Sequence, residues 1–464
     1  MESLMIMEKR KLLINFGVII LIAFISTSSF AETLTLEDCI EIALKKNQDV
    51  IRARNQVKTA DGSLWSAFGN FLPSVSAGIS SSETHSPKYT TTDASFFFMG
   101  SVGDTLLIPP DTFGIISREI EGGGISKSYG IGASARLTLF DGGQNVFNYL
   151  ASRANKKYYN HLADASEQDL ILNVKTYYYN YLRALDKLAI SEEAVKRGEE
   201  QFKLANSRYE VGSASKSDVL KAQVQYGNDK LGLLAAQNNV KISKALLAYY
   251  IGVDVNSEVE FSDQVTPRKY DGSELEALKL GMSNHPGLLA AEQILVSSKN
   301  DVRSTYGQYL PSLSLDLGKS WSAGSWSRVS ELNSEDSRWT FGASLNIPIF
   351  DGFSRKSNVT RAKVSLNNAR AAYYYSQNNI ALGIKEAYLE IQRANQALGV
   401  AEENVSAARE DMSLIQEKYN LGAATILELL DAQVSLITAE NNKVEADFDY
   451  NLAVARIENA MGVR

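Results

Sequence analysis

The most extended pattern in the chain is a heptad rhythm of apolar and small positions over residues 351–419. These positions recur at alternating steps of three and four, with one irregular step between Gly383 and Ile391. Large and small residues largely alternate along this seam, which suits helices that pack closely around each other. No proline interrupts the stretch, so at 1.5 Å per residue it predicts one coiled helix on the order of 100 Å long. No globular domain needs so long a helix.

The same long helix is predicted a second time. A shift of 210 residues places Phe140-Asp141-Gly142-Gly143 on Phe350-Asp351-Gly352-Phe353 without a gap. It also places Tyr209-Glu210-Val211-Gly212 on Tyr419-Asn420-Leu421-Gly422. An internal repeat of this length indicates one structural unit used twice.

Each half also contains two shorter predicted helices. The first ends at a Leu-Pro-Ser sequence, at Pro73 in one half and Pro311 in the other, because proline cannot continue a helix. After each long helix, a glycine is followed by Ser215-x-x-Asp218 or Thr425-x-x-Glu428. That is the pattern of a helix end followed by a capping box, which opens a return helix. Each half is therefore expected to lay a long helix beside two shorter ones.

Between the first helix and the long helix of each half, the apolar period changes to two. Apolar residues alternate with small or polar ones over 129–140 and 339–350. Segments of about ten residues with one apolar face are typical of membrane β-barrel strands, although the strands alone also fit a soluble antiparallel sandwich. Weaker alternation predicts two further strands, at Val75, Ala77 and Ile79 and at Leu313, Leu315 and Leu317. The resulting four strands cannot close a barrel, and lipid does not tolerate open edges, so a barrel requires several chains.

The hairpin loops differ in length between the halves. The first, about 82–128, is rich in Gly, Ser and Thr and contains Phe96-Phe97-Phe98-Met99. This aromatic cluster either folds over the barrel mouth or touches lipid. The second loop, about 319–337, is shorter, and Trp321 and Trp339 near the strand ends suit an aromatic girdle.

A secretory signal precedes the two repeats. Lys9-Arg10-Lys11 is a basic region, residues 12–25 are apolar, and residues 29–31 fit a small-x-small cleavage site. An uncleaved membrane anchor is the alternative, but about 14 apolar residues are few for spanning a membrane. The expected segments are the signal peptide (1–31), the first repeat (32–252), a linker or equatorial segment (253–272) and the second repeat (273–464). The first repeat contains a hairpin at 74–140, a long helix at 141–208 and a return helix at 217–251. The second repeat contains a hairpin at 312–350, a long helix at 351–419 and a return helix at 425–461.

Composition argues against several functions. Without the signal, 44 Lys and Arg face 52 Asp and Glu, which disfavours a nucleic-acid partner. Cys39 is alone, so no internal disulfide forms, and we expect a buried thiol on the first helix. The three histidines are scattered, and no phosphate-binding loop, zinc-site cysteine pair or nucleophile elbow occurs. The prediction is a protein without catalytic residues, metal or cofactor.

These features together resemble the TolC-type outer-membrane efflux channel family. The residues that carry the resemblance are the doubled helix–Leu-Pro-Ser–strand unit, Leu139-Phe140-Asp141-Gly142-Gly143 with its twin Ile349-Phe350-Asp351-Gly352, and Tyr-x-(Val/Leu)-Gly before each return helix. Each motif alone is weak, but their order, doubling and spacing over nearly all of the mature chain are specific. The family's Asn-Pro in the first helix is half kept, as Asn47-Gln48 and His285-Pro286.

The resemblance implies an α+β membrane protein of the Gram-negative outer membrane that extends into the periplasm. It implies a homotrimer whose twelve strands form one barrel in outer-membrane lipid, continuing into a twelve-helix periplasmic tunnel. It also implies a periplasmic adaptor protein and an inner-membrane pump of RND, ABC or MFS type, in tripartite efflux or type I secretion.

The resemblance further implies a constriction at the periplasmic tip, ringed by acidic residues of the return helices. Glu428 and Asp431 match those positions in the second half, and Asp218 matches one in the first, with Tyr419 as a hydrogen-bond donor to it. Residues three apart share a helix face, so three chains would bring six carboxylates into one ring, which favours cations. Glu428 also reads as a capping-box residue, and the two roles are compatible.

The turns Val211-Gly212-Ser213 and Leu421-Gly422-Ala423 match the family's adaptor-docking tips, although glycine there also serves plain helix capping. Ala424 stands where the family often has an arginine that holds the closed state. We therefore expect a weaker latch, in which Lys216 or Lys221 substitutes.

The function predicted from these arguments is a passive export duct powered by a partner. A trimeric surface adhesin with a coiled stalk is the alternative, but adhesins have one stalk and a C-terminal barrel, whereas here strands interrupt each half. An enzyme is the third reading. Drugs, metal ions and secreted proteins stay open as substrates.

Overall fold

The computed structural model describes residues 33–98, 113–256, 259–262, 269–333, 335 and 337–463. The predicted signal peptide, residues 1–31, lies outside the described residues. The chain divides into two compact units. We call them the strand unit (Gly62–Arg153 and Ser297–Leu366) and the helical unit (the described residues up to Asp61, Ala154–Val296 and the described residues from Asn367).

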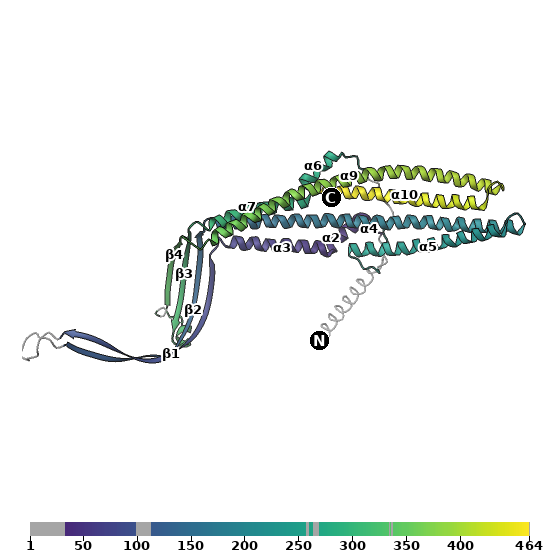
Figure 1. Ribbon diagram of the computed structural model, residues 1–464. Coiled ribbons are helices and arrows are strands. Elements are labelled where there is room, and N and C mark those ends of the chain that lie inside the picture. Colours follow the sequence, from purple (N-terminus) through teal and green to yellow (C-terminus); the bar gives the residue numbers. More distant parts are fainter. Residues whose placement is uncertain are drawn as a thin grey trace, which may run out of the picture. The chain divides into compact units, whose positions relative to one another are not determined.

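The strand unit contains one antiparallel sheet in the order β1-β2-β3-β4 (Figure 1). Its strands are β1 (Ser74–Phe98), β2 (Phe113–Phe140), β3 (Ser312–Ala323) and β4 (Ser337–Asn346). Strands β1 and β4 are the two edges, and each has one row of backbone groups without a neighbouring strand in the described chain. Strands from both halves of the repeat therefore share one sheet.

The two faces of this sheet differ in chemistry, because side chains alternate along each strand and the register matches like with like. One face is small and polar, with Ser76, Gly78, Gly132, Ser134, Gly318, Ser320 and Thr340. The other face is apolar, with Val75, Ile79, Ile131, Leu315, Leu317, Phe341 and Leu345. Val75 is 75% and Phe341 78% exposed, so no core covers the apolar face of the single chain.

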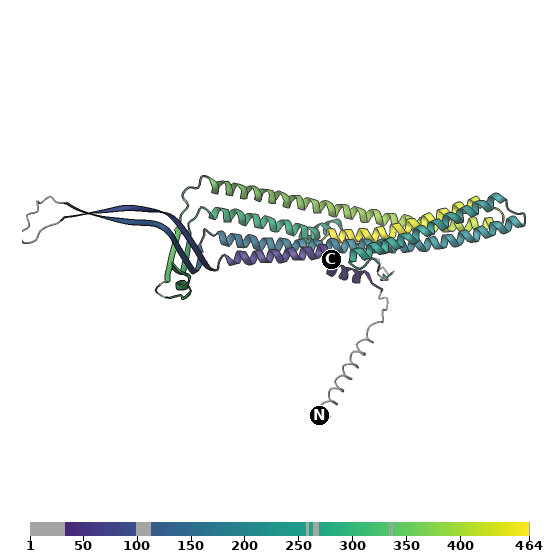
Figure 2. The ribbon, with the colours of Figure 1, turned by 90° about the horizontal axis from the view of Figure 1, so that it is seen from below.

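The loop expected at 82–128 is largely strand, which corrects the sequence analysis. Strands β1 and β2 continue in register until Phe98 pairs with Phe113, with a bulge between Ser86 and Tyr89 (Figure 2). The segment is rich in Thr and Ile, whose branched side chains favour strands. The Gly, Ser and Thr content of the segment had favoured a loop. Phe96, Phe97 and Phe98 thus belong to the end of β1.

The shorter hairpin contains a helical turn that the sequence analysis did not predict. This turn, α8 (Trp326–Ser330), follows β3, and its Val329 is fully buried.

Each first helix is broken into two, where the sequence predicted one. The pieces are α2 (Leu36–Lys46), α3 (Gln48–Gly69), α6 (Glu274–Asn284) and α7 (Pro286–Gly307). At Asn47 the side-chain oxygen accepts the backbone N–H of Asp49 at 2.8 Å, which starts a new helix. At His285 the following proline disfavours helical geometry. The two breaks occupy equivalent places in the repeats.

The long helices are α4 (Gln144–Glu210) and α9 (Ser354–Asn420), and the return helices are α5 (Lys216–Ile251) and α10 (Ile426–Ala460). In the helical unit, α5 runs back beside α4 and α10 beside α9 (Figures 1 and 2). Buried seam residues of α9 include Ala387, Ile391, Ala394, Ala401, Val405, Met412 and Tyr419. The heptad seam is thus the packing face of α9. Within the described residues, no helix has the length and hydropathy required to cross a membrane.

The turns that open α4 and α9 permit a matched test of the repeat. Gly142 and its twin Gly352 both have positive φ, +72° and +63°, which costs about 1–2 kcal/mol for any other residue. A Cβ on Gly142 would also meet the Gly307 carbonyl oxygen and lie 2.9 Å from the Leu310 Cβ, whereas a Cβ on Gly352 meets open space. We expect Gly142→Ala to lower the apparent unfolding temperature in detergent clearly more than Gly352→Ala. Equal decreases in the unfolding temperature of the two variants, measured by circular dichroism, would contradict this packing.

Candidate functional site

The predicted docking residues form two exposed turns at the ends of the long helices. Gly212 and Gly422 adopt φ of +81° and +74°, the left-handed geometry that ends a helix. Val211 is 78% and Leu421 84% exposed, and Ser213 and Ala423 are exposed beside them. An apolar side chain presented at the tip of a turn is available to a partner protein.

An arginine joins the two turns. Arg208, in the last turn of α4, donates hydrogen bonds to the carbonyl oxygens of Tyr419 (2.9 Å) and Asn420 (3.2 Å). Its guanidinium also lies 4.4 Å from the centroid of the Tyr419 ring. The last carbonyls of a helix lack intrahelical partners and carry the negative end of its dipole. Arg208 of the first half therefore caps the long helix of the second.

Arg208 was not predicted, because Lys216 or Lys221 was expected to replace the arginine that the family often has at the position of Ala424. Lys216 instead lies 5.3 Å from the ring of Tyr209. A basic residue in the last turn of a helix is expected to bond the terminal carbonyls of its own helix, and no spacing in the sequence showed that Arg208 would instead reach those of α9.

Tyr419 is buried rather than open to solvent. It is 5% exposed and packs with Met412, Ile426 and Leu429. No hydrogen bond joins its hydroxyl to Asp218 among the described residues, so the donor role expected for Tyr419 is not found within one chain. Its twin Tyr209 is 42% exposed, which makes the two turns unequal.

The predicted acidic residues divide into two capping groups and one open group. Asp218 accepts bonds from the backbone N–H (3.1 Å) and hydroxyl (2.8 Å) of Ser215. Glu428 bonds Thr425 in the same way, and these hydrogen bonds hold the pKa of Glu428 below its usual value. Asp431 is exposed, one turn further along α10, and makes no ion pair with a described residue. The structure thus brings Glu428 and Asp431 onto one helix, with only Glu428 used as a cap.

A buried polar cluster joins α4, α5 and α10. Asp229, 8% exposed, accepts hydrogen bonds from Gln225 (2.8 Å) and from the fully buried Gln433 of α10 (3.4 Å). The glycine at Gly198 on α4 makes this possible, since a Cβ there would meet Asp229 Oδ2. Burial raises the pKa of Asp229, although Gln225, Arg197 and Gln433 oppose the shift. The cluster was not predicted, because its contacts join three helices and the spacing of residues within one helix does not show which helices pack beside it.

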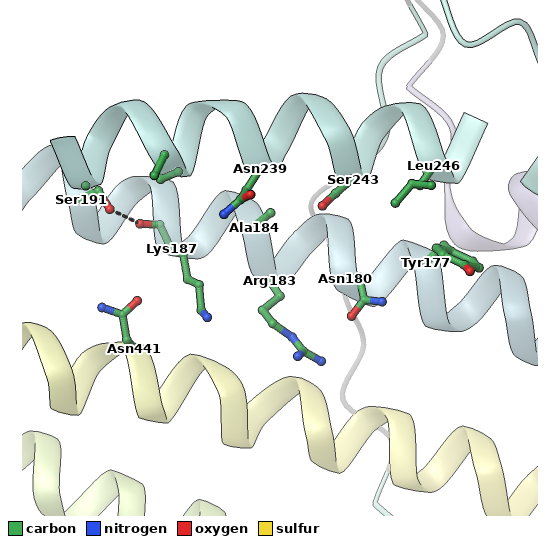
Figure 3. A pocket seen from close by; sticks show the side chains of 13 residues that line it. Tyr177, Asn180, Arg183, Ala184, Lys187, Ser191, Asn239, Ser243, Leu246 and Asn441 are labelled. Atoms are coloured by element: carbon green, nitrogen blue, oxygen red, sulfur yellow. Dashed lines mark hydrogen bonds between the residues drawn. The ribbon is translucent and has the colours of Figure 1, made fainter. Parts of the chain in front are cut away.

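A pocket of about 430 Å³ lies along α4 and α5, with Asn441 of α10 at its border (Figure 3). Arg183 and Lys187 point from α4 toward α10 in this view. Both are paired: Glu445 accepts from Arg183 at 2.7 Å and from Lys187 at 2.5 Å, and Asp449 lies 3.5 Å from Arg183. The pocket therefore has no unpaired cation with which to select an anion.

The described residues contain neither a metal-binding cluster nor a reactive thiol. They hold no group of three or more His, Cys, Asp and Glu placed to bind a metal ion. Cys39 is fully buried, and burial raises the pKa of its thiol to about 12, so the thiol stays protonated.

A family profile described as outer membrane efflux protein matches residues 39–253 and 278–463, which lie in both halves of the chain. The chain belongs to the outer membrane efflux protein family. The resemblance noted from the sequence is thereby confirmed, as is the outer membrane as its location. The match covers both repeats with their strands, so the adhesin alternative is not supported.

Curated relatives of this efflux protein agree with the assignment. The outer membrane efflux protein BepC of Brucella suis biovar 1 (strain 1330) is 23% identical over 337 residues, 72% of each chain. The outer membrane protein TolC of Vibrio cholerae serotype O1 is 26% identical over 304 residues, 64% of this chain and 68% of TolC.

Solved structures show the fold of the efflux protein. The outer membrane protein VceC of Vibrio cholerae matches with a TM-score of 0.76 at 17% identity, covering 92% of this chain and 96% of VceC. The outer membrane channel CmeC of Campylobacter jejuni matches with a TM-score of 0.76 at 18% identity, covering 92% and 85%.

The raised pKa of Asp229 predicts a pH-dependent effect of Asp229→Asn. The Asp229 carboxylate binds a proton more tightly in the native state than in the unfolded chain, where its pKa is the ordinary 3.8. The contribution of Asp229 to stability is therefore fully present below that value and is lost as the pH rises through the raised pKa. Asparagine does not ionise, so the unfolding temperature of the variant minus that of the wild type should increase from about pH 4 to pH 8.

Glu403→Gln, on the exposed side of α9, controls for the loss of one negative charge. A difference for Asp229→Asn that stays constant with pH, measured by circular dichroism, would contradict the assignment of a desolvated carboxylate.

Proposed function

We propose that three copies of this efflux protein form a passive duct, a twelve-stranded barrel continued by a tunnel of twelve helices, which exports substrates without chemistry or cofactor. The observation that carries the proposal is the four-stranded sheet, with two open edges and an uncovered apolar face. Four strands cannot close a barrel, and three copies bring twelve. Pairing β4 of one copy with β1 of the next would cover both open edges over the ten residues of β4, and hydrocarbon requires such cover for the part of the sheet that it surrounds.

The two faces of the sheet support this closure. The apolar face, with Val75 and Phe341, suits contact with lipid tails, and the small polar face suits a water-filled lumen. On the polar face Arg136 pairs with Asp316 at 2.5 Å across β2 and β3. A charged pair is tolerated where water reaches it and not where lipid does.

The helices also carry unused packing surface. Tyr375, Leu382 and Leu389 of α9 are 70%, 55% and 49% exposed and stand at heptad spacing. Leu220, Val224 and Leu231 form a similar row on α5. Apolar rows at coiled-coil spacing favour helices as partners, and in the proposed trimer the neighbouring copies supply them.

The same proposal includes a periplasmic adaptor at the exposed turns and an inner-membrane pump of RND, ABC or MFS type as the energy source. Relatives carry names such as "Cation efflux system protein CusC" of Escherichia coli and "Probable efflux pump outer membrane protein TtgC" of Pseudomonas putida. The first name specifies cations and the second specifies no substrate, although both are relatives of this chain. We propose that the pump, rather than this duct, selects what is exported.

In the proposed trimer, Asp431 lines the constriction with Glu428. We expect Asp431→Ala to leave trimers intact but to weaken block by Mg²⁺ about tenfold and to reduce cation selectivity, since three carboxylates leave a narrow ring. The measurement is single-channel conductance in planar bilayers under a KCl gradient, with Glu403→Ala as the control for lost charge. Unchanged cation selectivity and Mg²⁺ block would show that Asp431 does not line the pore. An absence of conductance in the wild type would contradict the proposed duct itself.

The docking turns make a separate prediction. A Cβ at Gly212 or Gly422 meets open space, so Gly212→Leu combined with Gly422→Leu adds bulk at the turns without an internal clash. We expect photo-crosslinking to the adaptor to fall about tenfold, because a partner packed against a glycine tolerates no added side chain. Leucine at either turn also carries the strain of positive φ, so the control is Gly352→Leu, which has φ of +63° and open space around it and therefore supplies matched bulk and matched strain elsewhere. Crosslinking that survives in intact trimers would show that the adaptor docks at another surface.

A further inference from the structure

One basic residue interrupts the apolar face of the sheet. Along β3, Leu313, Leu315 and Leu317 share this face, and Lys319 is the next residue on it. A cation on a face that meets lipid tails is costly unless its ammonium group reaches polar surroundings. Lys319 therefore needs a physical reason for its position.

Two tryptophans enclose Lys319. Its ammonium nitrogen lies 4.6 Å from the ring centroid of Trp321 and 4.8 Å from that of Trp339. Trp339 is paired directly with Lys319 across β3 and β4, and Trp321 is two residues further along β3. Both rings thus hold the cation on the apolar face by cation–π attraction.

The ammonium group has no anionic partner among the described residues. The nearby carboxylate on β3, Asp316, belongs to the opposite face and is paired with Arg136. The indole N–H of Trp321 is also buried without an acceptor, so no hydrogen bond of its own fixes this ring. Cation–π contacts use the charge and leave the three N–H donors of Lys319 available.

In the proposed barrel, the position of Lys319 along the sheet would correspond to the level of lipid headgroups. All four strands join their helices at one end, where Ser74 pairs with Arg136 and Ser312 with Asn346. Lys319 lies near the other end, four residues before β3 ends at Ala323. Tyr129 and Trp326 form an edge contact there, with centroids 6.3 Å apart.

Phe68, Phe71 and Tyr149 form a second aromatic cluster beside the helix-bearing end. Two aromatic bands that flank an apolar stretch are typical of a barrel in a bilayer.

We propose that Lys319, enclosed by Trp321 and Trp339, binds the phosphate group of an outer-leaflet membrane lipid. The proposal rests on the proposed function, since it requires the apolar face to meet lipid. The ammonium group donates to phosphate oxygens, the tryptophan rings cover the glycerol or sugar backbone and the lysine stem, and the acyl chains lie along the leucines of β3. Three copies give three equivalent sites around the proposed barrel.

Native mass spectrometry of delipidated protein in a neutral detergent tests the site. The probe is phosphatidylglycerol, compared with diacylglycerol of the same chains, which lacks the phosphate, and with glycerol 1-phosphate, which lacks the chains. The wild type should bind phosphatidylglycerol preferentially, up to three per trimer, and Lys319→Gln should weaken this binding about five- to tenfold. Lys319→Arg should retain it, and glycerol 1-phosphate should not displace it.

Arg338 provides the matched control, because it lies on the polar face beside Trp339 and is exposed. Arg338→Gln removes one positive charge at the same height and should leave binding unchanged. Equal binding by Lys319→Gln and the wild type, or equal loss in Arg338→Gln, would overturn the site, as would displacement by glycerol 1-phosphate.

If Lys319→Gln does not assemble, Trp339→Leu keeps the charge and the apolar surface but opens the enclosure. Binding weakened severalfold by Trp339→Leu supports the site, and unchanged binding overturns it. Trimer mass and conductance, recorded on the same preparations, separate the two proposals. A conducting Lys319→Gln trimer with undiminished lipid binding would contradict the lipid site alone. A wild-type protein that forms no trimers or shows no conductance would contradict the proposed duct.

Discussion

A four-stranded sheet with two unpaired edges is the constraint on which the rest of this molecule depends. Every backbone N–H and C=O left unpaired in hydrocarbon costs several kcal/mol, and both β1 and β4 present a row of them in the single chain. The chain itself has no further strand with which to cover them in its described part. The proposed trimer follows from that deficit, and the exposed heptad rows of α5 and α9 give the helices the same requirement for partners.

The two halves of the repeat differ where they contact each other. Arg208 caps the end of α9, and its twin by the 210-residue shift is Lys418. Asp229 bonds Gln433, whereas the position equivalent to Asp229 is Ala439. A lysine has no planar fork to reach two carbonyls, and an alanine makes no hydrogen bond. Each of these contacts thus depends on a polar side chain of the first half that its twin in the second half does not match, which makes the two helical hairpins of a chain unequal.

Periodicity in the sequence predicted the long helices, the shared pattern of the strands and the capped return helices, because each depends on local spacing. The breaks at Asn47 and His285 were missed, since apolar residues continue on both sides and only one break has a proline. Arg208 and Asp229 were missed for another reason. Their roles depend on which helices lie side by side. The spacing of residues within one helix does not show which helix packs beside it. The ribbon beyond residue 82 was taken for a loop because Thr favours strands and also occurs in loops.

Capping and pore lining place different demands on a carboxylate, and in the proposed trimer Glu428 would meet both. The bonds from Thr425 reach a single oxygen of Glu428, Oε2, and those from Ser215 reach only Oδ2 of Asp218. The second oxygen of each group makes no hydrogen bond with a described residue. Hydrogen bonds to the first oxygen also favour the ionised form of Glu428. A capping carboxylate at this turn therefore stays charged and retains one oxygen for a cation in the proposed ring, so the end of the helix and the mouth of the duct can use the same residue.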